Sequence, residues 1–286
     1  MFGKIITAMV TPFDENDNLN LASLKKLVDH LLKNKTSCIL VTGTTGESPT
    51  LSDVEKIVLY EKVLEYVNKK VPVIAGIGTN STKKTIEFMK KIEHLDLSGY
   101  LIVVPYYNKP DQEGIYQHFK LIASNTKKPI LIYNIPSRTG VDIEFSTIKR
   151  LKEIENIVGI KESNNNIDKI KQIKKELKDF KAYVGDDVLL YDAIKNNADG
   201  IVSVASHLYG KSINNIIQLI KKKRYKDAKD IFAIYKPKFQ ALFVKPNPVP
   251  IKQALNKLGF NVGSVRLPLV EMDDELKNEM YKILGI

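Results

Sequence analysis

A lysine ends a short apolar segment in the middle of the chain, where it could act as a nucleophile. The segment reads Ile157-Val158-Gly159-Ile160-Lys161-Glu162. A lysine held against apolar residues loses hydration, which disfavours the charged ammonium and leaves more of the free amine that attacks a ketone. Lys161 therefore predicts Schiff-base chemistry on a small keto acid.

Two other short segments end in hydroxyl groups that could serve this amine. Tyr133 closes Ile-Leu-Ile-Tyr, and Thr44 and Thr45 lie in Gly-Thr-Thr-Gly-Glu-Ser. A phenol is a poor base by itself at neutral pH, so a hydrogen-bonded relay to solvent is what would let Tyr133 move protons. Together these residues indicate an amine nucleophile with a proton relay.

Eight short runs rich in Val, Ile and Leu recur along the chain, separated by segments with helical periodicity. They lie at residues 5–10, 38–41, 71–75, 100–104, 130–133, 157–160, 182–184 and 201–204. Nearly continuous apolar runs are typical of parallel strands covered on both faces. Eight βα units close a (β/α)₈ barrel, whereas an open doubly wound sheet usually has fewer strands. The α/β pattern therefore predicts a TIM barrel over residues 1–224, with a helical appendage over residues 225–286.

The segments between the runs carry the signals expected of amphipathic helices. Ser52 and Glu55 have the spacing of a capping box. Three sets of apolar residues recur at helical spacing and are predicted to face the core. They are Val54, Ile57, Val58, Leu64 and Val67; Leu24, Leu27, Val28 and Leu31; and Ile115, Phe119 and Ile122.

Barrel enzymes place their chemistry in the loops that follow the strands, and polar residues cluster in several of these loops here. Each has a simpler explanation when taken alone, such as a solvated turn lysine, a core tyrosine or a surface arginine paired with a carboxylate. Their occurrence together on one rim favours a single pocket. The candidates are Thr44, Thr45, Tyr106, Tyr107, Tyr133, Arg138, Lys161 and Gly185.

Composition limits the other classes of function. The single cysteine, Cys38, lies in an apolar run, so a disulfide framework is excluded and a reducing compartment is expected. The N-terminus shows no signal-peptide pattern and no segment approaches the length of a membrane span, so we expect a cytoplasmic protein. The formal charge of +11 comes mostly from lysine doublets on separate polar helix faces, which predicts a solvated surface rather than binding to nucleic acid.

Motifs for cofactors and metals are weak. Gly76-Ile77-Gly78 lacks the third glycine of a dinucleotide site, and the four histidines have no metal-binding spacing. The sequence thus implies neither a cofactor nor a metal.

Four motifs resemble those of the dihydrodipicolinate synthase (4-hydroxy-tetrahydrodipicolinate synthase) family, within the class I pyruvate aldolase superfamily that also contains N-acetylneuraminate lyase. They begin at Gly43, Pro105, Tyr133 and Gly159, and read Gly-Thr-Thr-Gly-Glu-Ser, Pro-Tyr-Tyr-Asn, Tyr-Asn-Ile-Pro-Ser-Arg-Thr-Gly and Gly-Ile-Lys-Glu. The resemblance runs nearly end to end and includes residues 247–252. It implies condensation of pyruvate with L-aspartate 4-semialdehyde, a step of diaminopimelate and lysine synthesis.

The resemblance also implies a role for each matching residue. Lys161 would form an imine with pyruvate, Tyr133 would shuttle protons, and Thr44 would link Tyr133 to Tyr107. The residue matching Tyr107 reaches in from a neighbouring subunit in this family, which implies at least a dimer and usually a homotetramer. The remaining positions would bind substrate: Thr45 the pyruvate carboxylate, Arg138 the carboxylate of the second substrate, and Gly185 and Val202 the pocket lining through main-chain groups.

Two alternatives stay open at the level of sequence. N-acetylneuraminate lyase and the 2-keto-3-deoxy sugar acid aldolases share the lysine and tyrosine but are not expected to carry the full Ser-Arg-Thr-Gly motif around Arg138. A catalytically inactive barrel that serves as a binding or regulatory module is the alternative that is not an enzyme.

We predict weak or absent inhibition of the enzyme by lysine. Lysine-inhibited family members tend to have histidines at the positions of Asp53 and Lys56 and a glutamate at that of Lys84, although Ser48, Asn80 and Tyr106 match the effector site. A lysine in place of an effector-binding carboxylate repels the ammonium group of the ligand. Activity unchanged in millimolar lysine is the expected result, and a steep inhibition curve would contradict it.

Overall fold

Eight strands in chain order form a closed barrel, and every strand pair whose register is described is parallel. The computed structural model describes residues 2–164 and 166–286. The predicted α/β barrel is confirmed. The strands are β1 (Ile5–Ala8), β2 (Cys38–Val41), β3 (Val73–Gly76), β4 (Gly99–Val103), β5 (Ile130–Asn134), β6 (Ile157–Glu162), β7 (Lys181–Val184) and β8 (Gly200–Ser203).

Helices fill the connections between the strands and form the C-terminal part of the chain. The regular elements after residue 225 are helices, as expected from the end of the apolar alternation. The helices are α1 (Leu21–Lys33), α2 (Asp53–Val67), α3 (Thr82–Ile92), α4 (Gln112–Ala123), α5 (Pro136–Thr139), α6 (Phe145–Lys152), α7 (Asp168–Glu176), α8 (Leu190–Lys195), α9 (Ser206–Lys221), α10 (Tyr225–Ala241), α11 (Val249–Lys257) and α12 (Asp274–Leu284), with 3₁₀ turns η1 (Ser48–Thr50) and η2 (Asp187–Leu189).

The strands are short and buried almost throughout, because their side chains pack into the barrel on one face and under the helices on the other. Cys38 lies in this core, as predicted, and burial raises the pKa of its thiol. The apolar stripes predicted for α1 and α4 are also buried.

The start of α2 is as predicted, but its buried face is not. The Ser52 hydroxyl accepts a hydrogen bond from the Glu55 amide, and the Glu55 carboxylate accepts one from the Ser52 amide. Val54, assigned to the core face, is 71% exposed, and the buried residues of the helix are Leu59, Tyr60, Val63 and Val67. The helix contains apolar residues on several sides, so its periodicity alone did not identify the face that packs.

The chain divides into two compact units. The first comprises Met1–Pro72 and Ser203–Ile286, and the second comprises Val73–Val202. In the first unit, α1 packs against α2 and α9, and α10 packs against α9 and α12. Tyr209, Tyr235 and Phe239 form an aromatic cluster between α9 and α10. This cluster joins the C-terminal helices to the part of the barrel that the first unit contributes.

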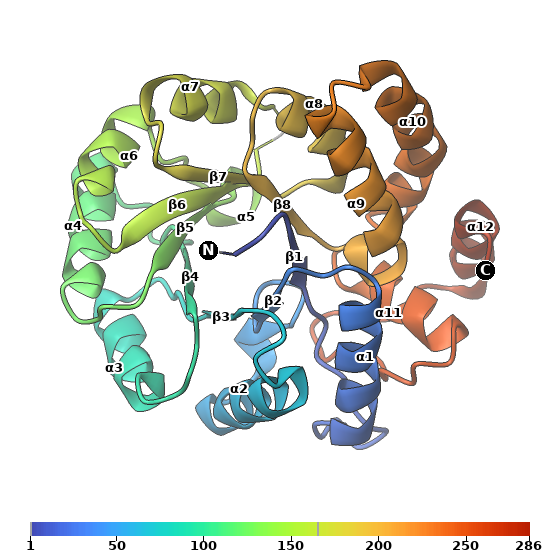
Figure 1. The fold of residues 1–286 in the computed structure, drawn as a ribbon. Coiled ribbons are helices and arrows are strands. Elements are labelled where there is room, and N and C mark those ends of the chain that lie inside the picture. Colours follow the sequence, from blue (N-terminus) through green and yellow to red (C-terminus); the bar gives the residue numbers. More distant parts are fainter. Residues whose placement is uncertain (1, 165) are drawn as a thin grey trace. The chain divides into compact units, whose positions relative to one another are not determined.

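The second unit contains strands β3 to β7 and nearly all of β8. Adjacent strands β4, β5, β6 and β7 make the most extensive pairings in it, and α4 packs against both α3 and α6 (Figure 1). β5 and β6 pair from Ile130 and Ile157 to Asn134 and Glu162, with a shift of register near the start. This pairing brings the ends of the two strands side by side.

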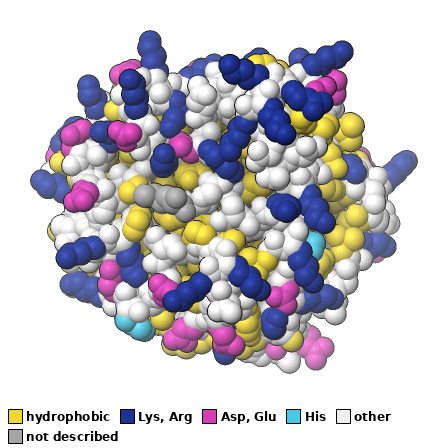
Figure 2. Space-filling view, in the orientation of Figure 1, with side chains coloured by type: hydrophobic (Ala, Val, Ile, Leu, Met, Phe, Trp, Pro, Cys, Tyr) yellow, Lys and Arg dark blue, Asp and Glu magenta, His cyan; other side chains and the backbone are white. Residues whose placement is uncertain are grey.

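Charged side chains are dispersed over the surface. Figure 2 shows lysines and arginines distributed over the visible face with acidic side chains among them. Among the described residues, no helix is both long enough and apolar enough to cross a membrane.

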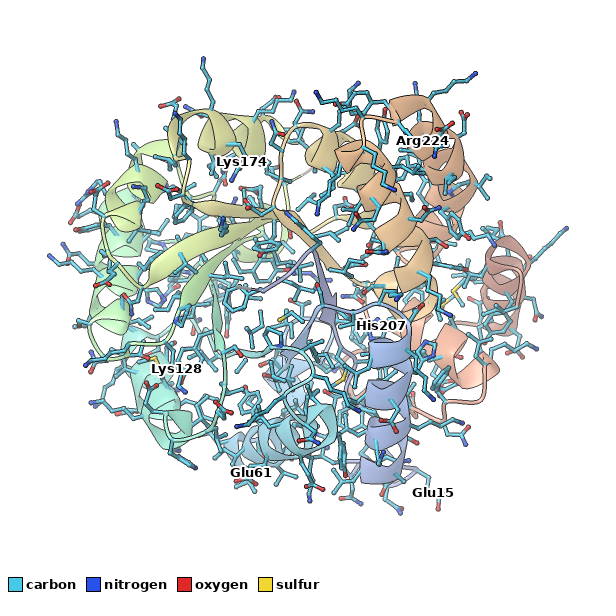
Figure 3. All side chains as sticks on the ribbon, viewed as in Figure 1. Glu15, Glu61, Lys128, Lys174, His207 and Arg224 are labelled. Carbon is cyan, nitrogen blue, oxygen red and sulfur yellow. The ribbon has the colours of Figure 1, made fainter. Side chains whose placement is uncertain are left out.

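Two histidines are buried and make stability depend on pH. His207 (labelled in Figure 3) accepts a hydrogen bond at Nε2 from the Val10 amide, 3.2 Å away, and its Nδ1 lies 2.8 Å from the Val204 carbonyl oxygen. His118 contacts the Thr82 hydroxyl through Nδ1 at 2.8 Å. Burial lowers the pKa of each imidazole from 6.5 to about 4.

We expect the free energy of unfolding to fall as the pH is lowered from about 6.5 to about 4. The unfolded chain binds protons at these histidines in that interval whereas the folded chain does not, so each contributes a loss of about 1.4 kcal/mol per pH unit. Urea unfolding at several pH values measures the slope. His118→Gln should reduce it, and His94→Gln, at an exposed position, is the control. An unchanged slope in His118→Gln would contradict the assignment.

Candidate active site

Lys161 and Tyr133 are direct neighbours across the pairing of β5 and β6. The register aligns Tyr133 with Lys161, and the Lys161 Nζ atom lies 3.9 Å from the centre of the Tyr133 ring. Each residue is 6% exposed. β5 continues one residue and β6 two residues beyond the predicted ends, so the pair lies within regular strand rather than in loops. The structure thus brings together the two residues predicted to carry the chemistry.

Gly185 leaves room beside the lysine side chain. A Cβ atom at this position would overlap the Ser163 hydroxyl and would stand 2.7 Å from Lys161 Cε. The Gly185 amide donates a hydrogen bond of 2.7 Å to the Glu162 carbonyl, which fixes the main chain here. The predicted role of Gly185 through main-chain groups is compatible with this placement.

Ser163 was not among the sequence candidates, although it lies two residues after Lys161. Its hydroxyl oxygen is buried and has no hydrogen-bond partner within the described part of the chain. A buried hydroxyl without a partner is costly, so this group is available to a reactant or a water molecule at the lysine.

A buried polar cluster lies on the other face of the same two strands. Asn134 Nδ2 is 2.9 Å from both carboxylate oxygens of Glu162 and 2.7 Å from Asp142 Oδ1. Lys169 Nζ contacts Asp142 and lies 3.6 Å from Glu162 Oε2. Burial raises the pKa of the Glu162 carboxyl, and the nearby Lys169 ammonium partly opposes this effect. Apart from the positions of Asn134 and Glu162 next to Tyr133 and Lys161, no motif or periodicity in the sequence points to these residues.

Arg138 lies in the short helix α5, where it is exposed. Pro136 begins this helix and Gly140 ends it in a left-handed conformation. The Thr139 hydroxyl lies 3.1 Å from the Ile135 carbonyl oxygen and 2.8 Å from that of Val141, so it closes the turn. Within the described residues the guanidinium group forms no ion pair, which leaves its donors available to an anionic ligand.

Tyr107 follows β4 and projects into solvent. It is 87% exposed, with φ of +74°, and its amide donates to the Thr139 carbonyl at 3.4 Å. A left-handed backbone conformation is uncommon for a bulky residue. The conformation of this loop is therefore maintained by its surroundings and not by the intrinsic preference of tyrosine. Tyr106 is 36% exposed.

Thr44 and Thr45 lie in the first unit, in the turn that follows β2. The Gly46 amide donates to Gly43 and the Glu47 amide donates to Thr44, so the turn is closed by main-chain hydrogen bonds. Thr45 is 2% exposed, and its hydroxyl accepts a hydrogen bond of 2.9 Å from Asn247 Nδ2. Within the described residues no acceptor faces the Thr45 hydroxyl proton, so this proton can be donated to an anionic ligand.

A buried ion pair anchors the same turn. Lys252 Nζ lies 2.9 Å from Glu47 Oε1, and the Arg266 amide donates to Glu47 Oε2 at 2.9 Å. Lys252 is fully buried, and its pKa is lowered mainly by burial, while the Glu47 charge raises it. Asn247 and Lys252 lie in the segment 247–252 that resembles the family, but the resemblance assigned neither residue a role.

The remaining candidates lie in both units. Val202 is buried in β8. Of the effector positions, Ser48, Asp53 and Lys56 belong to the first unit, and Asn80, Lys84 and Tyr106 to the second. Across residues 2–164 and 166–286, no group of three or more His, Cys, Asp or Glu side chains is arranged to hold a metal ion.

The chain is similar to known proteins over its full length. All 286 residues match the model of the Dihydrodipicolinate synthetase family. A protein of Oceanobacillus iheyensis named 4-hydroxy-tetrahydrodipicolinate synthase is 45% identical over 285 residues, covering 99% of this chain and 97% of that protein.

Solved structures give the same result. The crystal structure of a dihydrodipicolinate synthase from Bacillus anthracis matches with a TM-score of 0.97 and 44% identity, covering 100% of this chain and 98% of that one. A structure described as a monomeric dihydrodipicolinate synthase variant matches with a TM-score of 0.94 and 40% identity, covering 99% and 97%. The resemblance seen in the sequence motifs is confirmed over the full length, and the chain belongs to the dihydrodipicolinate synthetase family.

Proposed function

We propose that the protein condenses pyruvate with L-aspartate 4-semialdehyde to give 4-hydroxy-tetrahydrodipicolinate, the step that leads to diaminopimelate and lysine. The names of the full-length relatives support this activity. The observation that carries the chemistry is the buried amine of Lys161 over the ring of Tyr133. The same relatives do not favour the alternative hypotheses. These are an N-acetylneuraminate lyase, a 2-keto-3-deoxy sugar acid aldolase and a catalytically inactive barrel.

The reaction begins at the lysine. The Lys161 amine attacks the ketone carbon of pyruvate, and loss of one water from the resulting carbinolamine gives an imine. The protonated imine withdraws electrons, so a proton leaves the methyl group and an enamine forms. The enamine carbon then bonds to the aldehyde carbon of the second substrate, whose oxygen takes up a proton. Attack by the amine of that substrate on the imine carbon closes the ring and releases Lys161, so one water is lost overall.

Tyr133 is the group that we assign to proton transfer, since the centre of its ring lies 3.9 Å from the lysine amine and its phenol can donate and accept a proton. The family resemblance supports a relay through Thr44 and Tyr107 and contact of Thr45 with the pyruvate carboxylate. Main-chain groups of Gly185 and Val202 would line the pocket. The hydrogen bond from Asn247 to Thr45 is compatible with the role of Thr45 as a donor.

Assembly of at least two subunits, and of four in the usual family form, is part of the proposal. Tyr107 projects outward from its own subunit, as a residue that completes a neighbour's site would. One relative is described as a monomeric variant, so oligomeric state differs within the family. We further propose a cytoplasmic location, without participation of nucleic acid or membrane.

Trapping of the imine tests the function most directly. Incubation with pyruvate and borohydride should add the mass of the reduced adduct to the peptide containing Lys161. Lys161→Ala should abolish trapping and nearly abolish turnover while the protein still folds, because no other group supplies the nucleophile. Turnover with aspartate semialdehyde, N-acetylmannosamine and glyceraldehyde, each with pyruvate, should favour the first strongly. The absence of an adduct on the wild-type peptide would rule out this mechanism.

Arg138→Ala should impair use of the second substrate and spare the first step. A guanidinium group binds a carboxylate through two parallel hydrogen bonds, so its loss should raise the KM for aspartate semialdehyde by about ten- to a hundredfold. Imine trapping with pyruvate alone should be unchanged. Arg138→Lys keeps the positive charge but cannot form the two parallel hydrogen bonds, so its KM for aspartate semialdehyde should be intermediate. A wild-type KM in Arg138→Ala would remove this residue from the site.

A further inference from the structure

The pairing of β5 with β6 contains a shift that decides which residue lies opposite Tyr133. Ile130 aligns with Ile157, but the next residue, Leu131, aligns with Gly159, so Val158 is skipped. Beyond the shift, Tyr133 aligns with Lys161 and Asn134 with Glu162. Without it, Tyr133 would align with Ile160, and the lysine would occupy the opposite face of the sheet, because successive side chains alternate between faces.

Gly159 lies where the register changes. A Cβ atom here would overlap the carbonyl oxygen of Lys181 on β7 and stand 2.7 Å from the Lys181 Cβ atom. Because a main-chain oxygen cannot move away easily, only glycine fits this close approach between β6 and β7. The residue that permits the shift thus lies two positions before Lys161.

Asn134 and Glu162 form the last aligned pair after the shift. They project to the face opposite to that of Tyr133 and Lys161, since each follows its catalytic neighbour directly in the strand. Their side chains are joined by hydrogen bonds of 2.9 Å to both carboxylate oxygens, and both residues are at most 1% exposed. The Asn164 amide also donates to Glu162 Oε1 at 2.9 Å. Without the shift, Asn134 would align with Lys161 instead of Glu162.

Lys169 and Asp142 are the charged groups that face this pair. Lys169, from α7, lies 3.6 Å from Glu162 Oε2 and donates to the Ile143 carbonyl at 2.8 Å. Asp142, from the loop after α5, accepts from Asn134 and Lys169. Lys169 therefore compensates the Glu162 carboxylate in a buried position, where an uncompensated charge would be costly.

We propose that the hydrogen-bonded Asn134–Glu162 pair positions the Lys161 amine over Tyr133 by locking the shifted register of β5 and β6. Neither residue touches a reactant in this role; both act through the strands on which the reacting groups lie. The inference rests on the proposed function, because positioning is read out as the rate of imine formation.

Single-turnover imine trapping with pyruvate and borohydride tests the proposal. Asn134→Leu and Glu162→Leu should slow trapping by about ten- to a hundredfold, since small misplacements of reacting groups have effects of this size. Glu162→Gln keeps an acceptor for the Asn134 amide and should restore the rate to within about threefold of the wild type. Asn134→Ala, which creates no bulk, replaces Asn134→Leu if that variant does not fold.

Asp199→Asn is the matched control in the same unit. Asp199 forms a partly buried ion pair of 2.7 Å with Lys174 (labelled in Figure 3) and accepts from the Ala182 amide, at the opposite ends of the strands from Lys161. The Asp199→Asn substitution should lower the melting temperature of the protein without slowing imine trapping. Wild-type trapping rates in folded Asn134→Leu (or Asn134→Ala) and Glu162→Leu, or equal slowing in Asp199→Asn, would overturn the proposal. Failure of the wild type itself to form the adduct would instead refute the proposed function.

Discussion

The alignment of Tyr133 with Lys161 is the constraint on which the candidate chemistry depends. An amine and a phenol on adjacent parallel strands meet only if they share a face, and a slip of one residue would separate them. The one-residue shift in the pairing of β5 with β6 supplies the required register. The reactive pair is thus positioned by main-chain geometry, which is stiffer than a loop and suited to holding reacting groups close together.

A buried polar network also holds the turn that contains Thr44 and Thr45. The turn with Thr44 and Thr45 is held from Glu47, whose carboxylate meets the buried Lys252 and the Arg266 amide. Burying such a pair contributes little net stability, but removing one partner would leave an unpaired charge in the core. Networks of this kind specify one conformation, which is what a segment that must present hydroxyl groups requires.

The sequence was sufficient for the main elements of the fold, because these depend on local pattern, and the same patterns selected the candidates. Apolar runs located all eight strands, and the polar residue at the end of one run identified Lys161. The register shift at Val158 was not visible, since it depends on the close approach of Gly159 to β7. The contacts of Thr45 with Asn247 and of Glu47 with Lys252 join residues about two hundred positions apart. The periodicity of apolar residues within one helix or strand carries no information about contacts between residues so far apart in the sequence.

The partners of the buried and partly buried lysines separate structural roles from a candidate chemical role. Lys252 meets Glu47, Lys169 meets Asp142 and Glu162, and Lys174 meets Asp199. In the described part of the chain, Lys161 has no such ion pair, and its amine lies against an aromatic ring. The acidic neighbour in the sequence, Glu162, is directed to the other face of the strand, where Asn134 and Lys169 engage it. The alternation of side chains along β6 therefore keeps a carboxylate next to the nucleophile in sequence and away from it in space.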